Sequence, residues 1–455
     1  MFKIILTIAV IVLAYSLCWS TIINVPADYS TIQQGINAGG DGDTVIVQPG
    51  IYYEHIDFNS HDVLLGSMFI MTGDTSYISS TIIDGSNSGT VVKIWRGERG
   101  MAGVEGMTMQ NGRGADGGGI YIGGATPIIS RNVIQNNSSG VNGDGGGIYF
   151  AGGGGLIINN VIRNNTTNLK GGGICNRYGD CLIIGNIICD NTSNSSGGGI
   201  MNYGSDSFVS GNVIYGNYSG FKGGGICFNG TGALINNVIC INTASDAGGG
   251  IRLWSDANLT IINNIIRHNT SPLGPQIRLG IGSSVSVSYS NVDGGWQGTG
   301  NIDLDPLFRD PLNADFHLMS IACGDSANSP CIDAGHPDSL DLILDCFHGL
   351  GGVRSDMGAF GGGYIWTHNC IYEVGDVNGD ASYDGLDVTY GVAFFKGNFP
   401  NPVYGCFCTY SDYWFVSGDV NGSCSYNGLD ITYGVSYFKG YVTEIFPCPE
   451  CPPVE

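Results

Sequence analysis

Residues 145–165 read GGGIYFAGGGGLIINNVIRNN, and residues 171–191 read GGGICNRYGDCLIIGNIICDN. Both stretches begin with a glycine triplet and an isoleucine, and both continue with an asparagine, two β-branched residues and a second asparagine at matching positions. The string Gly-Gly-Gly-Ile occurs with its isoleucine at positions 120, 148, 174, 200, 226 and 251, so successive copies are 28, 26, 26, 26 and 25 residues apart. A period of this length indicates stacked repeats.

Two asparagine columns keep register with the glycine triplets through all six copies. The first column is Asn132, Asn160, Asn186, Asn212, Asn237 and Asn264, and the second is Asn137, Asn165, Asn191, Asn217, Asn242 and Asn269. We expect the glycine triplet to supply a positive φ at one corner of each turn. We expect the asparagine before the β-branched pair to adopt the left-handed conformation at another corner, with its amide bonded up the column in a ladder.

Each copy also contains three short runs rich in isoleucine and valine, as in residues 147–150, 156–158 and 161–162. Such runs, divided by glycine or asparagine, favour β-strands, and no hairpin signal joins one to the next. Each run is therefore predicted to pair with the same run of the next copy, in parallel, in register and ~4.8 Å apart. The result is an all-β parallel β-helix (a solenoid) with a core of inward isoleucine and valine. A leucine-rich repeat is the alternative, but its L-x-x-L-x-L pattern is missing.

The solenoid is expected to extend beyond the six clear copies. Four earlier runs, residues 44–47, 63–65, 81–83 and 91–94, and one later run, residues 285–289, read as irregular turns. Residues 43–290 span 248 residues (290 − 43 + 1), which at this period predicts nine to ten turns. A short helix over 30–36, with Ser30 as its N-cap, is predicted to cap the open strand edges at the start.

The composition excludes several other classes. The chain has 455 residues, 76 of them glycine, and 17 Lys and Arg against 39 Asp and Glu give a formal net charge of −22. Glycine costs about 1 kcal/mol per interior helical position relative to alanine, which excludes a helical bundle. A hydrophobic share of 42% excludes a disordered acidic chain. An acidic surface repels phosphate, so nucleic acid is not an expected partner.

The N-terminus reads as a signal peptide. Residues 1–20 contain one basic residue, Lys3, an apolar run over 4–17 and small or polarisable residues at Cys18 and Ser20. The run is short for a membrane span, which needs ~20 residues, although a retained anchor is the alternative. No other apolar run is long enough to cross a membrane. We therefore expect a secreted or cell-surface protein without a transmembrane anchor.

Segments at both ends of the repeat region carry a family resemblance. The entry segment VPADYSTIQ at 25–33, with GDTV at 42–45, and the closing segments DPLF at 305–308, SPCIDAG at 329–335 and DMGAF at 356–360 resemble bacterial proteins of the pectin-lyase-like superfamily over residues 22–363. The resemblance implies a right-handed, single-stranded β-helix whose closing segments form terminal turns. It also implies a groove along one strand face, where lyases use clustered aspartates for Ca²⁺ with an Arg or Lys base and hydrolases use two or three carboxylates.

We searched the strand after each glycine triplet for such a site. The first outward column is Tyr121, Tyr149, Cys175, Met201, Cys227 and Arg252, and the second is Gly123, Ala151, Arg177, Tyr203, Asn229 and Trp254. Neither column holds carboxylates on neighbouring turns, so the catalytic residues stay unknown. Tyr178, Tyr203 and Trp254 are candidates for stacking on sugar rings, with ordinary exposed aromatics as the alternative. His268 is isolated and reads as a surface residue rather than a base.

Acidic residues offer two weaker candidates. Asp116, Asp144 and Asp246 precede glycine triplets and would form either a cation stripe or solvated loops. The irregular early turns carry Asp57, Asp62, Asp84, Arg96, Glu98 and Arg99, where a catalytic cluster is also open.

The cysteines divide into two groups. Cys175 and Cys227 share a column two turns apart, as do Cys189 and Cys240. Two turns separate Cα atoms by ~9.6 Å, which exceeds the ~7 Å limit for a disulfide, so these thiols are predicted to be free. Nine cysteines follow the solenoid, and in an exported chain they predict disulfides with one left over, with a zinc site as the alternative.

The composition changes after Trp366, where two related loops predict calcium binding. Oxygen-bearing residues at loop positions 1, 3, 5, 7 and 12 suit a hard cation such as Ca²⁺. The first loop offers Asp376, Asn378, Asp380, Ser382 and Asp387, and the second offers Asp419, Asn421, Ser423, Ser425 and Asp430. The second loop has Ser423 in place of a carboxylate and is expected to bind more weakly.

The pair of loops resembles a type I dockerin, a tandem of calcium loop-helix units. The resemblance implies a cohesin-like or cell-surface protein as partner. Two features depart from the dockerin pattern: position 6 is Ala381 or Cys424 rather than glycine, and the loops lie 43 residues apart (419 − 376). A calcium-stiffened module without a partner is the alternative.

These expectations combine into one organisation. Residues 1–20 form a signal peptide, 21–320 the β-helix, 321–366 its C-terminal cap and 367–455 a small α-helical, dockerin-like calcium module with a Cys-rich tail. The predicted function is that of a non-catalytic surface or glycan-binding protein. The alternative is a polysaccharide lyase or glycoside hydrolase carried on the same solenoid.

Overall fold

The computed structural model describes residues 21–99, 102–204, 207–339, 341, 344–346, 349–361, 406–409 and 412–414. The chain divides into two compact units, residues 21–365 and residues 1–20 with 366–455. In the second unit, the described residues form one antiparallel strand pair, β39 (Cys406–Thr409) and β40 (Asp412–Trp414). The predicted signal peptide and the predicted ligands of both calcium loops lie outside the described residues. No helix within the described ranges is both long enough and apolar enough to span a membrane.

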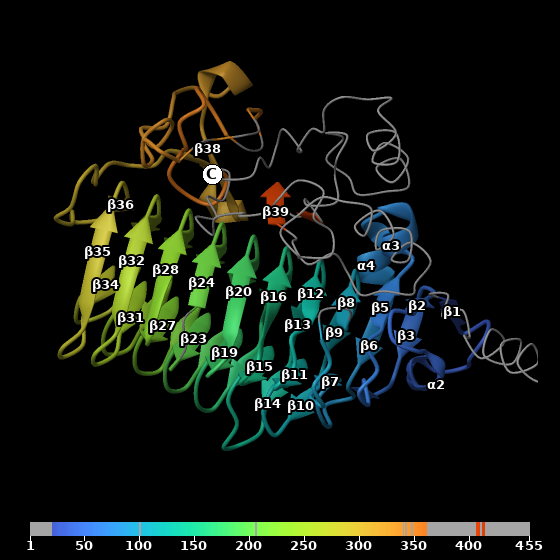
Figure 1. Cartoon of the computed structure of the whole chain (residues 1–455). Coiled ribbons are helices and arrows are strands. Elements are labelled where there is room, and N and C mark those ends of the chain that lie inside the picture. The colour runs from blue at the N-terminus through green and yellow to red at the C-terminus, as the bar shows by residue number, and fades with distance from the viewer. Residues whose placement is uncertain are drawn as a thin grey trace, which may run out of the picture. The chain divides into compact units, whose positions relative to one another are not determined.

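The first unit is a parallel β-solenoid, as predicted, with four sheets whose strands are one turn apart (Figure 1). Sheet A contains β1 (Ile22–Val25), β2 (Thr44–Val47), β5 (Leu64–Ser67), β8 (Gly103–Glu105), β12 (Ile128–Ser130), β16 (Gly154–Ile158), β20 (Asp180–Ile184), β24 (Ser207–Ser210), β28 (Thr231–Ile235), β32 (Asn258–Ile262) and β35 (Ser284–Ser288). Sheet B contains β3 (Gly50–Tyr52), β6 (Thr81–Asp84), β9 (Thr108–Gln110), β13 (Val133–Gln135), β17 (Val161–Arg163), β21 (Ile187–Cys189), β25 (Val213–Tyr215), β29 (Val238–Cys240), β33 (Ile265–Arg267) and β36 (Asn291–Val292).

Sheets C and D complete each turn. Sheet C contains β4 (Ile56–Asp57), β7 (Val92–Ile94), β11 (Ile120–Gly123), β15 (Ile148–Ala151), β19 (Ile174–Arg177), β23 (Ile200–Tyr203), β27 (Ile226–Asn229), β31 (Ile251–Leu253) and β34 (Ile277–Arg278). Sheet D contains the two-residue strands β10 (Arg113–Gly114), β14 (Ser138–Ser139), β18 (Thr166–Thr167), β22 (Thr192–Ser193), β26 (Tyr218–Ser219) and β30 (Thr243–Ala244).

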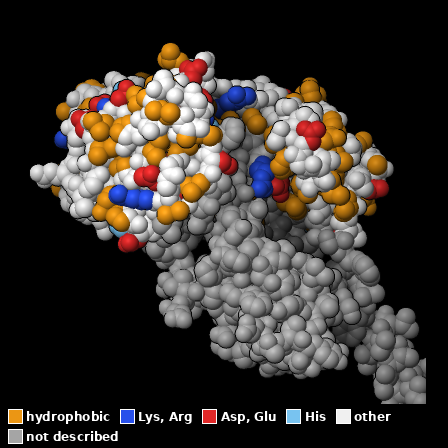
Figure 2. All heavy atoms as spheres, turned by 90° about the horizontal axis from the view of Figure 1, so that it is seen from above, with side chains coloured by type: hydrophobic (Ala, Val, Ile, Leu, Met, Phe, Trp, Pro, Cys, Tyr) orange, Lys and Arg blue, Asp and Glu red, His pale blue; other side chains and the backbone are white. Residues whose placement is uncertain are grey.

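The strand register confirms that equivalent residues of successive copies stack. Ile148 pairs with Ile174 in sheet C, and Val161 pairs with Ile187 in sheet B. The ten strands of sheet B agree with the predicted nine to ten turns. One continuous core of inward isoleucine, valine and leucine runs from Ile23 to Val292. On the outside, hydrophobic and uncharged side chains predominate over the face in Figure 2, and charged side chains are few.

The asparagine ladders are present and form two continuous files. In the first, each side-chain Nδ2 donates to the Oδ1 one turn on, from Asn132 to Asn264, at 2.9–3.1 Å. The second file, from Asn137 to Asn269, has the same bonds at 3.0–3.1 Å. These amides also bond backbone groups at the corners, so buried polar groups of each turn are satisfied inside the solenoid.

The expected left-handed position is wrong by one residue. The positive φ belongs to the residue before each ladder asparagine, such as Asn159 (φ 55°) before Asn160 and Gly185 (φ 63°) before Asn186. This residue turns the chain, and the ladder asparagine follows with its amide directed inward. At the glycine corner the prediction is confirmed: the first glycine of the triplet has a positive φ, for example 70° at Gly171.

The helical cap at the start is present with a different N-cap. Helix α2 (Ile32–Ala38) is capped by Thr31, whose side chain accepts a hydrogen bond from the Gln34 N–H, and not by Ser30. Ser30 instead bonds the side chain of Gln34. Two further short helices, α3 (Phe69–Thr72) and α4 (Ser76–Ser80), connect β5 of sheet A to β6 of sheet B along the chain.

The closing segments are not terminal turns of the solenoid, which corrects the expectation from the family resemblance. They form an antiparallel hairpin, β37 (Phe308–Asp310) and β38 (Asp315–Leu318), with the 3-10 helices η1 (Pro311–Asn313) and η2 (Ile321–Cys323). Proline has no N–H to donate to a strand ladder, so Pro306 and Pro311 interrupt parallel pairing.

This closing region packs on the outer face of sheet B. Phe316 and Leu318 lie in one apolar cluster with Val238 and Ile265 of the solenoid. Cys323 and Cys346 form a disulfide, and Cys331 is free and buried. Disulfides were predicted for this part of the chain, and this pair is one of them.

Candidate functional site

The outer face of sheet C is the candidate site, and strand alternation determines which side chains reach it. On β19 and β23, Ile174 and Ile200 point into the core, while Cys175 and Met201 point outward in register. The same alternation runs along the sheet and confirms both outward columns expected from the sequence.

Outward does not mean exposed on this face. Tyr149, Cys175, Met201 and Cys227 form an apolar cluster on the outside of the sheet, and each is at most 5% exposed. Cys175 and Cys227 are free thiols separated by Met201, as predicted. Burial raises the pKa of the Cys227 thiol to about 12 and that of the Tyr149 hydroxyl to about 12. Both side chains are therefore neutral packing groups at ordinary pH.

The aromatic rings on this face lie in two rows along the solenoid. In the first row, the Tyr121 ring centroid is 6.5 Å from that of Trp95 and 5.7 Å from that of Tyr149. The second row contains the three predicted stacking residues. Six turns separate β7 from β31, so the two rows, which follow one another along the solenoid, together extend over roughly 29 Å at ~4.8 Å per turn.

The structure brings Tyr178, Tyr203 and Trp254 together edge to face. The ring centroids of Tyr178 and Tyr203 are 5.6 Å apart, and those of Tyr203 and Trp254 are 5.9 Å apart. Tyr178 is 56% exposed. The sugar-binding role of these residues stays a prediction.

Cations lie against these rings, an arrangement that the repeat pattern did not predict. The Lys170 Nζ is 4.9 Å from the Tyr203 ring centroid and 5.1 Å from that of Trp254. The Arg177 guanidinium is 5.7 Å from the Tyr178 ring centroid. Such contacts are attractive because the face of an aromatic ring is electronegative. Lys170 comes from the corner before a glycine triplet, so only the folded structure places it over rings one and three turns away.

Two arginines occupy adjacent turns at the C-terminal end of the first outward column, the one that begins with Tyr121. Arg252 on β31 pairs in register with Arg278 on β34. Arg278 was missed because its turn has Gly274-Pro275-Gln276 in place of the glycine triplet. The register of 26 residues after Arg252 is the signal that identifies it. Burial, with a smaller effect of the Arg278 charge, lowers the pKa of Arg252.

Basic residues are concentrated here. Six of the chain's 17 Lys and Arg residues lie on the outer face of sheet C or at its edge: Lys93, Lys170, Arg177, Lys222, Arg252 and Arg278. Within the described part of the chain, no carboxylate lies within ion-pair distance of Arg177, Arg252 or Arg278.

The aspartates at the glycine corners are already bonded to their neighbours. Asp116 accepts the Asp144 N–H at 2.7 Å, and Asp144 accepts the Lys170 N–H at 3.0 Å. Burial raises the pKa of Asp144, although the Lys170 N–H and charge oppose the shift. Asp246 lies 3.8 Å from the Lys222 Nζ. These side chains connect the corners of neighbouring turns, and they do not come together as a single group of ligands.

The early turns place their charged residues in local contacts. Arg96 pairs with Asp57 at 3.7 Å, and Glu98 is buried and accepts the Arg96 backbone N–H at 2.6 Å. Asp62 accepts a backbone N–H at 2.7 Å, and Asp84 accepts two side-chain amides at 2.7 and 2.9 Å. In the part of the chain that the structure describes, no group of three or more His, Cys, Asp or Glu side chains is placed to hold a metal ion.

His268 lies away from this face, at a corner after sheet B. Its side chain lines a pocket beneath the closing hairpin. His268 is therefore separate from the aromatic face, as its isolated position in the sequence predicted.

Comparisons with known proteins give one solved structure and no family. No family model matches the sequence, and no curated protein matches it. The crystal structure of pectate lyase Pel9A is similar, with 14% identity and a TM-score of 0.44, over 75% of this chain and 96% of that chain. The assignment of the fold rests on the strand register described above.

Proposed function

We propose that this chain is an exported glycan-binding protein whose sheet C face binds an acidic polysaccharide. In this proposal, the predicted calcium loops attach the solenoid to a cohesin-like or other cell-surface protein. The observation that carries the proposal is the coincidence of aromatic rows with arginines that have no carboxylate partner among the described residues.

The charge distribution supports an anionic ligand. The chain has a formal net charge of −22, yet Arg177, Arg252 and Arg278 lie on one face beside Tyr178, Tyr203 and Trp254. Guanidinium groups form strong paired hydrogen bonds with carboxylates. Aromatic rings supply flat apolar surface that suits the C–H face of a sugar ring. A polymer of uronic acid offers both groups at every residue.

The geometry also suits a linear ligand. Equivalent positions repeat every ~4.8 Å along the solenoid, so an extended chain lying along sheet C would pass the rings of Tyr178, Tyr203 and Trp254 on successive parts of its length. It would then reach Arg278 one turn beyond Arg252.

Affinity electrophoresis in gels containing polygalacturonate or a neutral galactan tests this proposal. The full chain should be retarded by polygalacturonate, less so at higher salt, and little by galactan. The double variant Arg252→Gln/Arg278→Gln should bind about tenfold more weakly or worse, because a hydrogen bond to a charged group contributes about 1.5–3 kcal/mol. Arg113→Gln, on sheet D, removes a charge outside the face and is the matched control. Equal retardation by both glycans, or equal loss in Arg113→Gln, would refute the proposal.

The second candidate is a polysaccharide lyase on the same face, and one observation favours it. Arg252 lies in register with Arg278 on the next turn. Burial, with the charge of Arg278, lowers the pKa of Arg252, which is the direction that a basic side chain needs to abstract a proton. Incubation with a panel of polysaccharides distinguishes the candidates. New unsaturated ends absorbing in the ultraviolet identify a lyase, new reducing ends without them identify a hydrolase, and binding without products supports the non-catalytic role.

A further inference from the structure

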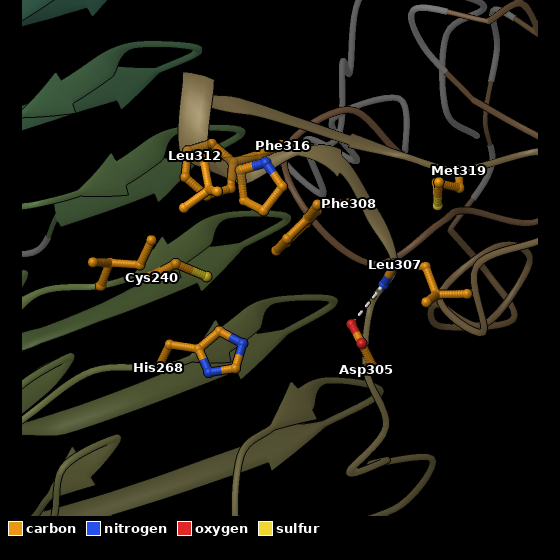
Figure 3. A pocket seen from close by; sticks show the side chains of 10 residues that line it. Cys240, His268, Asp305, Leu307, Phe308, Leu312, Phe316 and Met319 are labelled. Carbon is orange, nitrogen blue, oxygen red and sulfur yellow. Dashed lines mark hydrogen bonds between the residues drawn. The ribbon is translucent and has the colours of Figure 1, made fainter. Parts of the chain in front are cut away.

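A pocket of about 410 Å³ lies between the outer side of sheet B and the closing hairpin, away from the sheet C face. One wall comes from the ends of β29 and β33, with Cys240, Ile241 and His268. Figure 3 shows the opposite wall, with Phe308, Phe316 and Leu312 near the top and Asp305 below. The volume is within the range of small-molecule sites, ≈ 300–1,000 Å³.

Backbone strain singles out this pocket. Ile241 and Leu307 both line it, and both have a left-handed backbone, with φ of 59° and 51°. They are the only aliphatic residues larger than alanine with a positive φ in the described ranges. A branched side chain at a positive φ is a genuine outlier, and such outliers cluster at ligand-binding sites.

The repeat itself shows what Ile241 replaces. The same corner of earlier turns holds Asn164, Asp190 and Gly216, which tolerate the left-handed conformation, and the corner then holds Ile241 and His268 in the two turns that face the hairpin. Burial within the protein does not account for the change, because Ile241 is 44% exposed. The strain at Ile241 is therefore not offset by full burial of its side chain within the protein.

The pocket offers two polar side chains in an apolar lining. The Asp305 carboxylate accepts the Leu307 N–H with one oxygen, Oδ1, at 3.0 Å. His268 lies across the pocket from it in Figure 3. The Phe308 and Phe316 rings meet edge to face with centroids 5.3 Å apart. Asp305 and His268 thus lie at one end of the pocket, and the two phenylalanine rings lie at the other end (Figure 3).

We propose that this pocket binds a single aromatic ring bearing one hydroxyl group, that is, a phenol. The ring lies against Ile241 and Phe308, and the hydroxyl donates to the Asp305 carboxylate, which faces His268 across the pocket (Figure 3). A sugar ring fits less well because its several hydroxyls would face aliphatic and aromatic side chains without hydrogen bonds. This site is separate from the glycan-binding face and does not depend on the function proposed for it.

Ligand-observed NMR and calorimetry on the full chain test the proposal with 4-methylphenol as the probe and toluene as the shape-matched control. We expect saturable binding of 4-methylphenol and at least fivefold weaker binding of toluene. Asp305→Asn should reduce that preference for the phenol. Absence of saturable 4-methylphenol binding, or equal binding of toluene, would overturn the proposal.

Ile241→Asn tests the strain argument directly, because it restores the residue type of Asn164. We expect affinity for 4-methylphenol to fall at least fivefold while the thermal midpoint stays constant or rises. Asp190→Asn, in the same column but outside the pocket, should leave affinity unchanged. A lowered midpoint in Ile241→Asn would identify Ile241 as a packing residue and overturn the assignment, as would equal loss of affinity in both variants.

Discussion

Asn160 donates from its side-chain Nδ2 to the Oδ1 of Asn186, its counterpart one turn further along the solenoid, at 3.0 Å. Asn160 also donates its backbone N–H to the same Oδ1 at 2.9 Å. One buried oxygen therefore accepts two bonds from the preceding turn, while the Asn186 Nδ2 donates to the backbone carbonyls of Ile157 and Ile184. Each ladder asparagine thus joins three neighbouring turns.

Asn186→Ala is expected to destabilise the solenoid by about 2–4 kcal/mol. The substitution removes the acceptor of the buried Asn160 N–H and the side-chain bonds to the Ile157 and Ile184 carbonyls, and a buried unsatisfied group costs about 1–3 kcal/mol. Urea unfolding measures the effect. Asn194→Ala is the matched control, since Asn194 makes one exposed side-chain bond to Asn168. Equal shifts in the two variants would contradict a structural role for the ladder.

Gly172→Ala is expected to be more harmful than an ordinary glycine substitution. A Cβ atom there would lie 2.4 Å from the Gly198 carbonyl oxygen and 2.7 Å from the backbone of Thr192, so the turns cannot stack at their present spacing. Overpacking of this kind costs at least about 1–3 kcal/mol.

Gly40→Ala provides the control for Gly172→Ala. The nearest atom to its added Cβ is a side-chain oxygen of Asp43 at 3.7 Å, and no positive φ is needed. Its thermal midpoint should stay constant or rise slightly, because alanine restricts the unfolded chain. A normal midpoint in Gly172→Ala would show that the glycine corner is not sterically required.

The repeat allowed the solenoid to be predicted because each column has one physical cause. The glycine corner needs both a positive φ and room for the next turn, and the asparagine file needs one buried amide per turn. In the pair Asn159-Asn160 either residue suits the left-handed position, so the sequence alone did not separate the turning residue from the ladder residue. Gly185-Asn186 resolves the ambiguity, since glycine occupies the turning position there.

Contacts formed by long side chains and by non-repeating segments were not predictable in the same way. Lys170 reaches the rings of Tyr203 and Trp254 across turns, which no spacing rule encodes. Arg278 follows a corner in which Gly-Pro-Gln replaces the glycine triplet, so a search for the Gly-Gly-Gly-Ile string does not find its turn. The closing hairpin packs on sheet B through Phe316 and Leu318, a tertiary contact without a repeat to reveal it.

Calcium binding by the predicted loops is expected to depend on Asp387. Position 12 of such a loop supplies a carboxylate, and its removal takes away both charge and ligand oxygens. Calorimetric titration of the full chain with Ca²⁺ should show uptake that weakens at least tenfold in Asp387→Ala. Asp412→Ala, between the two loops in sequence, should bind as the unmodified chain does. Unchanged uptake in Asp387→Ala would refute the ligand assignment.

Stability is expected to fall as pH rises because of Asp356 in the closing region. Its carboxyl is 1% exposed and accepts the N–H groups of Asp333 and Leu350 at 2.7 and 2.9 Å. Burial, with the negative charges of Asp341 and Asp333, raises its pKa to about 8, against 3.8 when unperturbed. Between these values the folded state keeps the proton and the unfolded state releases it. The stabilisation is therefore complete below about pH 4 and is lost towards pH 8, by at most about 1.4 kcal/mol per pH unit.

Asp356→Asn removes this titration while retaining a hydrogen-bond acceptor, so its thermal midpoint should change less between pH 5 and pH 8 than that of the unmodified chain. Asp338→Asn is the matched control, since the Asp338 side chain is 91% exposed. Its pH dependence should follow that of the unmodified chain. A parallel pH dependence in Asp356→Asn would show that this carboxyl is ionised in the folded state, and that the three aspartates are stabilised as charged groups by the surrounding backbone N–H donors.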